Sequence, residues 1–270
     1  MKPDQWPALA GWVGAHGLAV FVALLCALLL LAAGIVWVWG RQVLRRTRAS
    51  LSPSATLLLN VAAGFAIVFG AAAGFAEIAE QLGPDGAMAL ADEALSASIG
   101  KHVSGGTLQV FGLLTHLGDP LVLTLLGVAV ALGLWWRGQH SLALGWVLAL
   151  GGNALLNPLL KRVFERVRPV HEHGLVAELG WSFPSGHSSG ATVAYGMLAY
   201  VMLRTLPPAW HLPAVLGATA LVFTVGSSRV FLQLHFASDV VAGFASGSAW
   251  LMVCILSVGS SQRWRHLRSR

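Results

Sequence analysis

Residues 17–39 read GLAVFVALLCALLLLAAGIVWVW, an apolar run without a charged side chain. A helix needs about 20 mostly apolar residues to cross a bilayer, so this run predicts a transmembrane helix. Six further apolar stretches lie at 57–76, 120–136, 142–159, 188–204, 212–228 and 239–257. The sequence therefore predicts an all-α fold, a polytopic transmembrane helical bundle of seven spans.

The composition agrees with a membrane protein. Of the 270 residues, 56% are hydrophobic and only 10% are charged, and the mean hydropathy is +0.71. A soluble domain carries about 25% charged residues. Cys26 and Cys254 lie inside apolar runs, which favours buried small side chains over a disulfide or a metal pair. The pair His171-x-His173 is typical of a solvated loop, so we expect no metal site.

The arginines predict which side of the membrane each loop faces. Loops on the cytoplasmic side carry an excess of Lys and Arg. The loop 40–56, the turns at Arg137 and Arg204, and the tail from Ser260 together hold ten arginines and no acidic residue. Seven spans then place the N-terminus outside and the C-terminus in the cytoplasm. The net charge of +6 follows from this topology, and we expect no nucleic-acid partner.

The two ends of the chain have simple interpretations. Arginines follow the run 17–39, whereas a secretory signal carries its cations before a shorter apolar core, so we expect a retained helix. The basic tail 263–270 indicates a stop-transfer anchor, with contact to anionic membrane lipids as the alternative.

The region 77–119 is the main segment between spans on the outer side. It contains a turn signal at 83–86 and then a pattern over 92–99 that predicts a short amphipathic helix at the interface. A second short helix over 107–117 would follow the break at Gly105 and Gly106. We expect a packed connector, and the alternative is a roof over a binding site.

Polar side chains gather in three clusters at the outer ends of the later spans. They are, in chain order, Lys161 with Arg168-Pro169, Pro184-Ser185-Gly186-His187, and Ser228-Arg229 with His235 and Asp239. A phosphoryl group in its transition state spreads negative charge over several oxygens, and catalysis needs fixed donors around them. The clusters therefore predict a site that holds a phosphate, attacks it and protonates the leaving group.

Five of these residues suit phosphate binding. Lys161, Arg168 and Arg229 supply cations, and an arginine can bind two oxygens at once. Ser185 adds a hydroxyl group, and Gly186 lets a backbone N–H approach closely where a helix begins.

The neighbouring prolines and arginines have supporting roles in this interpretation. Pro169 fixes the chain after Arg168, and Pro184 opens the second cluster. Arg162 and Arg166 lie in the same stretch as the first cluster, and we expect them to anchor the chain at the lipid headgroups instead.

The histidines provide the reactive groups. His235 and Asp239 are four residues apart, so they would share one face of a helix. Asp239 can orient one ring nitrogen of His235 and leave the other as a nucleophile, which predicts a phosphohistidine intermediate. His187 would then protonate the leaving oxygen and later activate water.

Two spacings concern the support of this site. Asn153, Asn157 and Lys161 recur every four residues, so Asn157 supports Lys161 or the backbone near Pro158, or else it is a helix-packing amide. The glycines at 243 and 247 predict close packing of the last helix against a neighbour.

The three clusters together resemble the signature of the type 2 phosphatidic acid phosphatase superfamily. The matching patterns are Lys161-x6-Arg168-Pro169, Pro184-Ser185-Gly186-His187 and Ser228-Arg229-x5-His235-x3-Asp239. The resemblance covers about 57–257. It implies a six-span phosphatase core, here with one extra N-terminal span, and catalysis without a metal or other cofactor.

The resemblance also implies a role for each matching residue. The phosphate ligands would be Lys161, Arg168, Ser185, Gly186 and Arg229. His187 would be the acid, His235 the nucleophile and Asp239 its orienting group. The chain would divide into an N-terminal helix and basic loop (1–56), a lipid phosphatase membrane domain (57–257) and a basic cytoplasmic tail (258–270).

The expected function is that of an integral membrane phosphatase acting on a lipid phosphate or diphosphate. The abundance of Arg, Ala and Gly favours a bacterial source, and hence the inner membrane with the site facing outward. Undecaprenyl diphosphate, phosphatidylglycerol phosphate and phosphatidic acid are the leading substrates. The alternatives are a phosphotransferase that passes phosphate to a glycolipid acceptor and a non-catalytic lipid-phosphate binder or transporter. The sequence predicts no oligomeric state.

Overall fold

A computed structural model of the chain describes residues 5–46, 53–83, 86–169 and 179–268. Within these ranges the regular structure is entirely helical, which confirms the predicted all-α class. The elements are α1 (Trp6–Ala15), α2 (Gly17–Arg46), α3 (Pro53–Glu80), α4 (Ala87–His102), α5 (Gly105–Leu114), the 3-10 turn η2 (Thr115–Gly118), α6 (Pro120–Trp136), α7 (His140–Phe164), α8 (Gly186–Thr205), the 3-10 turn η3 (Pro208–Trp210), α9 (His211–Phe231) and α10 (Ala237–Arg268).

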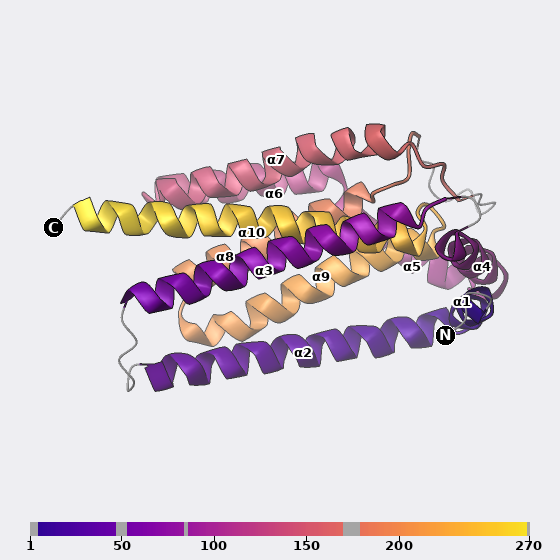
Figure 1. Ribbon diagram of the computed structural model, residues 1–270, viewed down its shortest axis with the longest axis horizontal. Helices are drawn as coiled ribbons and strands as arrows, with labels where there is room; N and C mark the ends of the chain where they lie inside the picture. Colours follow the sequence, from indigo (N-terminus) through magenta and orange to yellow (C-terminus); the bar gives the residue numbers. More distant parts are fainter. Residues whose placement is uncertain (1–4, 47–52, 84–85, 170–178, 269–270) are drawn as a thin grey trace.

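The long helices lie side by side in one bundle, and two shorter helices cross one end of it (Figure 1). Each of the seven predicted apolar stretches lies within one long helix: α2, α3 and α6 to α10. In Figure 1, α1 and α4 are seen nearly end-on at the end of the bundle opposite the C-terminus. The predicted amphipathic helix over 92–99 is α4, whereas α1 was not predicted.

Five of the described helices are long and apolar enough to cross a membrane. These lie at Gly17–Val38, Ala62–Glu80, His140–Phe164, Pro208–Phe231 and Ala237–Gly259. A sixth span results if Gly105–Gly118 and Pro120–Trp136, bent by 42° at their junction, are taken together. The expected span at 188–204 forms α8 but is not among them.

The reason lies in the position of α8 inside the bundle. It packs against α7, α9 and α10, and ten of its twenty residues are buried. A helix surrounded by protein does not need the lipid-facing apolar surface of an outer helix, so Ser, Thr and Gly residues are tolerated along it. Around it, Trp146 of α7 is fully buried and donates to the Gly127 carbonyl at 2.8 Å.

Gly243 and Gly247 bring α10 into close contact with α8, as predicted. A Cβ atom at 243 would lie 2.7 Å from the Ser185 carbonyl oxygen and 2.8 Å from the Cβ atom of Ser188. At 247 it would lie 2.9 Å from the Ser189 carbonyl oxygen. Both distances are shorter than a normal contact, so only glycine permits this approach of the two helices.

The N-terminal helices lie at one end and along one side of the bundle (Figure 1). On α4, Ser98 Oγ donates to the Gly11 carbonyl of α1 at 2.6 Å, so this part of the connector region packs against α1. The extra helix α2 packs along α9, where Phe21 stacks on Phe223 at 5.5 Å. Cys254 is buried as expected, whereas Cys26 is exposed on the surface of α2.

Candidate active site

The three predicted clusters meet at the end of the bundle that α4 crosses. Arg168 Nη1 lies 3.0 Å from His235 Nε2, which joins the first and third clusters. The backbone N–H of Ser185 donates to the Asp239 carbonyl at 3.0 Å, which joins the second and third. Arg168 and His235, which are 67 positions apart in the chain, are therefore neighbours in one site.

The segment before α8 connects the two cations of the first cluster. Lys161 Nζ donates to the Trp181 carbonyl at 2.8 Å, and Arg168 Nη2 donates to the same oxygen at 3.3 Å. Close by, the buried Phe183 ring packs on Phe164 at the end of α7, with ring centroids 5.0 Å apart. The shared carbonyl holds the two positive side chains next to each other.

His235 does not lie on a helix with Asp239, and that prediction was wrong. The helix α9 ends at Phe231 and α10 begins at Ala237, so His235 lies in the turn between them. The backbone N–H groups of Leu234 and His235 both donate to the Arg229 carbonyl, at 3.0 and 3.2 Å. This turn holds the buried His235 ring with Nδ1 3.5 Å from Asp239 Oδ2.

The surroundings of His235 define its tautomer. A guanidinium group can only donate, so the Nε2 atom that Arg168 contacts must carry a lone pair. The ring proton is then on Nδ1, which faces the Asp239 carboxylate and Ser182 Oγ, 3.3 Å away. A neutral imidazole with its lone pair on Nε2 is the form required of a nucleophile.

Ser182 was not predicted, although it lies between His235 and Asp239. Its fully buried hydroxyl group hydrogen-bonds to Asp239 Oδ2 and lies within hydrogen-bonding distance of His235 Nδ1. Asp239 Oδ2 also accepts from the backbone N–H of Phe236 at 2.9 Å. No spacing rule indicates a lone serine before a helix, so only the folded chain identifies it.

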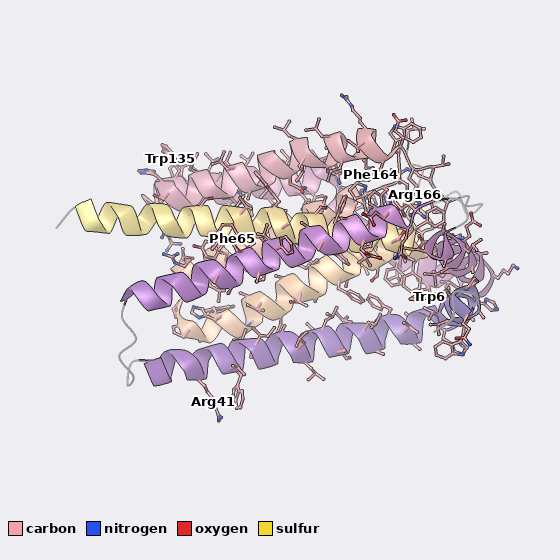
Figure 2. All side chains as sticks on the ribbon, viewed as in Figure 1. Trp6, Arg41, Phe65, Trp135, Phe164 and Arg166 are labelled. Carbon is pink, nitrogen blue, oxygen red and sulfur yellow. The ribbon has the colours of Figure 1, made fainter. Side chains whose placement is uncertain are left out.

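Arg166 binds inside the site, so the expectation of a headgroup anchor was wrong. Its Nη1 donates to Asp239 Oδ1 at 2.7 Å and its Nη2 to Asp92 Oδ2 at 2.9 Å. The side chain is 12% exposed, and its guanidinium lies 4.3 Å from the centroid of the Phe236 ring. Figure 2 shows Arg166 close to the end of the bundle where α4 crosses. Arg162, one turn earlier, is exposed.

Asp92 extends this network to α4. Its carboxylate accepts from the hydroxyl group and, at 3.2 Å, from the backbone N–H of Ser238 at the start of α10. Burial raises the pKa of Asp92 above its usual value, while Ser238 and Arg166 oppose that rise. Gln233 Nε2, in the turn that holds His235, donates to the Ser96 carbonyl at 2.7 Å. Thus α4 contacts the turn that carries His235 and the first turn of α10.

The second cluster opens α8 as predicted. Ser185 caps the helix, and its Oγ accepts from the Ser188 N–H at 3.3 Å. Asn157 Nδ2 lies 3.4 Å from the Pro184 carbonyl and 3.3 Å from Ser189 Oγ. Asn157 therefore contacts the backbone of the second cluster. Gly186 lies against it, since a Cβ atom there would be 3.0 Å from Asn157 Oδ1.

The remaining predicted residues occupy the other side of the α8 N-terminus. His187 Nε2 lies 2.9 Å from Asp119 Oδ1, and Arg229 Nη1 donates to Thr115 Oγ1 at 2.8 Å. Arg229 is 1% exposed. Asp119 and Thr115 belong to the connector region and were not predicted as site residues. Pro169 is buried directly after Arg168.

The described residues show no metal centre. Within 5–46, 53–83, 86–169 and 179–268, no three His, Cys, Asp or Glu side chains are placed to hold a metal ion. His171 and His173 lie outside these ranges.

Comparisons with known proteins agree with this fold. A family model of the PAP2 superfamily matches residues 141–263. Phosphatidylglycerophosphatase B of Bacillus subtilis is 35% identical over 182 residues, which are 67% of this chain and 88% of that protein. A crystal structure of a transmembrane PAP2 type phosphatidylglycerolphosphate phosphatase from Bacillus subtilis superimposes with a TM-score of 0.66 at 32% identity. The superimposed region covers 73% of this chain and 96% of the Bacillus subtilis chain.

A further relative is lipid A 1-phosphatase of Rhizobium johnstonii, 33% identical over 142 residues; the match spans 49% of this chain and about half, 52%, of that protein. The fold and these relatives define the chain as an integral membrane enzyme of the phosphatase class, which confirms that prediction. The chain belongs to the PAP2 superfamily.

Proposed function

We propose that this protein hydrolyses the phosphate ester of a membrane lipid through a phosphohistidine intermediate on His235. The observation that carries the proposal is the 3.0 Å contact between Arg168 Nη1 and His235 Nε2. It puts the lone pair of the attacking nitrogen next to a guanidinium that can bind phosphate oxygens. A phosphoryl group at this position would meet nucleophile and cation together.

In the first step, His235 Nε2 attacks phosphorus and the bond to the leaving oxygen breaks. Arg168, Lys161 and Arg229 neutralise the charge on the phosphoryl oxygens, and the Ser185 hydroxyl group and the Gly186 N–H add donors at the α8 N-terminus. His187 gives a proton to the leaving oxygen. Asp239 and Ser182 stabilise the positive charge that develops on the His235 ring.

In the second step, water attacks the phosphohistidine. His187 accepts a proton from the water while the bond between phosphorus and Nε2 breaks, which releases inorganic phosphate. No step requires a metal ion, so EDTA should leave turnover unchanged.

The side chains around the cations favour a lipid substrate. Val163, Val167 and Leu179 are 72%, 74% and 99% exposed. Val163 and Val167 lie close to Lys161 and Arg168 in the chain, and Leu179 precedes Gly180, whose carbonyl accepts from Arg168 Nε at 3.1 Å. Exposed apolar groups beside a phosphate site suit a molecule whose acyl chains remain in the bilayer. The names of the relatives favour phosphatidylglycerol phosphate first and a lipid A type phosphate second, ahead of undecaprenyl diphosphate and phosphatidic acid.

The same site chemistry permits a phosphotransferase, in which an acceptor hydroxyl group replaces water in the second step. A non-catalytic lipid-phosphate binder is disfavoured, because binding alone does not require the contact between His235 and Asp239. We further propose that the protein lies in a bacterial inner membrane with this site facing outward.

The test is a phosphate-release panel with purified protein in detergent and the four lipids above as substrates. We expect release of inorganic phosphate from at least one of them, fastest from phosphatidylglycerol phosphate. His235→Ala should abolish release, by at least about 10³-fold, because covalent catalysis is lost. His102→Ala is the control, because the described hydrogen bonds of His102 go to Ser98 in its own helix. Full activity of His235→Ala would refute the mechanism, and phosphate appearing on an acceptor would favour the phosphotransferase.

A further inference from the structure

Asp119 connects the predicted acid histidine to the protein surface. It follows η2, and its Oδ1 lies 2.9 Å from His187 Nε2 while its Oδ2 lies 2.6 Å from His116 Nδ1. The His187 side chain is 11% exposed, Asp119 is 33% exposed and His116 is 59% exposed. The three side chains thus form a chain of contacts from inside the site to its outer surface.

The fold fixes the position of Asp119 from two neighbouring helices. On α8, the Tyr195 hydroxyl group donates to the Leu117 carbonyl at 2.7 Å. On α9, Arg229 Nη1 donates to Thr115 Oγ1 at 2.8 Å. Both acceptors belong to η2, so the turn that ends in Asp119 is attached to the same two helices that carry the predicted site residues.

Gly118 lets this turn approach the histidine. A Cβ atom at 118 would lie 3.0 Å from His187 Cδ2 and 2.4 Å from Val225 Cγ1. Any larger residue would push η2 away from α8 and lengthen the contact between Asp119 and His187. The contact between Asp119 and His187 therefore requires glycine at position 118.

The contact determines which nitrogen of His187 can react. A carboxylate only accepts hydrogen bonds, so Nε2 of His187 carries a proton directed at Asp119. Because Nε2 serves Asp119, proton exchange with the substrate is assigned to the other ring nitrogen, Nδ1. A carboxylate on the remote nitrogen also stabilises the imidazolium form that a general acid needs.

We propose that Asp119 is the positioning residue of the acid–base histidine, holding His187 so that Nδ1 serves the leaving oxygen. This inference rests on the proposed function. In the first step the proton on Nδ1 moves to the leaving oxygen as the bond between that oxygen and phosphorus breaks. The proton on Nε2 stays in place and continues to be donated to Asp119. In the second step Nδ1 takes a proton from the attacking water, which restores the imidazolium. Asp119 stays ionised throughout.

Few other charged groups act on this pair. Elements packed against η2 are α5, α6, α8 and α9, and neither α5 nor α6 contains a charged residue or a histidine. On α9 the nearby cation is Arg229, and on α8 the nearby titratable groups are His187 itself and Tyr195. His116 lies on the same turn as Asp119 and contacts its other carboxylate oxygen, while Asp119 Oδ1 contacts His187.

The experiment compares Asp119→Asn with wild type on two phosphate esters that differ in their leaving group. Dioctanoyl phosphatidic acid expels a poor alkoxide leaving group and needs its proton, whereas p-nitrophenyl phosphate expels a stable phenolate. We expect kcat/KM to fall about 10- to 100-fold for the lipid and less than about 3-fold for the aryl ester. The alkaline limb of the pH profile for the lipid should move to lower pH, because His187 loses the carboxylate that favours its charged form.

Controls separate positioning from folding. Asp119→Glu should recover part of the lipid activity, and Glu93→Gln, which removes an exposed carboxylate on α4, should resemble wild type. Equal losses on both esters, or no loss on either, would overturn the role of Asp119. A fully active Asp119→Asn beside an inactive His235→Ala would reject this inference and leave the proposed function standing. A wild-type protein inactive on every ester would reject both.

Discussion

Among single residues, Arg166 differs most from its sequence-based interpretation. Lys161, Arg162, Arg166 and Arg168 lie within eight positions, and residue type alone does not distinguish a phosphate ligand from a lipid anchor or a structural ion pair. Two carboxylates identify Arg166 as part of a structural ion-pair network. Its guanidinium bridges Asp239 and Asp92, at N–O distances of 2.7 and 2.9 Å. Because the network is largely buried, loss of the arginine would leave two buried acids without their shared cation.

We therefore predict that Arg166→Gln lowers kcat at least about 10-fold with little change in KM. Asp239 would lose the donor that fixes its carboxylate, so His235 would be less well oriented, and removing one partner of a buried ion pair typically costs about 3–5 kcal/mol. Steady-state kinetics and thermal unfolding in detergent measure both effects. Arg166→Lys should be intermediate, because a lysine cannot bridge the two acids as a planar guanidinium does.

Arg162→Gln is the matched control for this change. It removes the same charge one turn away, from an exposed position, and should leave kinetics and unfolding temperature close to wild type. A larger loss in Arg162→Gln than in Arg166→Gln would contradict the role of Arg166.

At the level of elements, the contact between α10 and the start of α8 determines the geometry of the site. Gly243 lies against the Ser185 carbonyl, and the Ser185 N–H bonds to the Asp239 carbonyl four residues earlier in α10. The sequence predicted the start of α8 and the close packing. It did not predict that the turn 232–236 separates His235 from α10, because a spacing of four fits a helix and a compact turn equally well.

We predict that Gly243→Ala lowers kcat and destabilises the protein by about 1–3 kcal/mol, as overpacking of a close contact does. The added methyl group would lie 2.7 Å from a backbone oxygen, so α10 must move away from the phosphate-binding end of α8. Unfolding temperature and phosphate release measure the two effects.

Gly259→Ala in the same helix is the matched control. No atom lies within 4 Å of a Cβ at that position, so the intrinsic preference of alanine for helices should leave stability equal or slightly higher. Identical behaviour of the two variants would show that the close packing of α10 on α8 is unimportant for the site.

At the scale of the whole molecule, the bundle carries its site at one end. The helices α1 and α4 cross that end, and Trp135 near the end of α6 lies at the opposite end from Arg166 (Figure 2). The arginine count predicts that the site end faces outward, because Arg41 on α2 and the turn that follows Trp135 lie toward the opposite end (Figure 2). The division into 1–56, 57–257 and 258–270 stays a prediction, although α2 packs on α9.

The orientation can be tested with single cysteines in a Cys26→Ala, Cys254→Ala background. We predict that Leu179→Cys, beside the site and 99% exposed, reacts with a membrane-impermeant maleimide added to intact spheroplasts. Arg137→Cys, exposed at the opposite end of α6, should react only after the membrane is opened. The reverse labelling pattern would place the site in the cytoplasm.

The sequence by itself determined the helical class, the positions of the long helices, the three clusters and the family. These properties depend on local patterns: apolar runs, residue spacing and a motif in register. It also predicted that the clusters converge, because all of them end spans on one side of the membrane.

Only the tertiary structure decided which polar side chains are partners. Asp92 meets Ser238 across 146 positions, Ser182 meets Asp239 across 57, and Asp119 meets His187 across 68. A hydrogen bond depends on a separation of a few ångströms and on direction, and neither is encoded in local periodicity. The packing of α4, η2 and α8 sets those distances, so the acids and the serine that orient the two histidines emerge only when the helices are assembled.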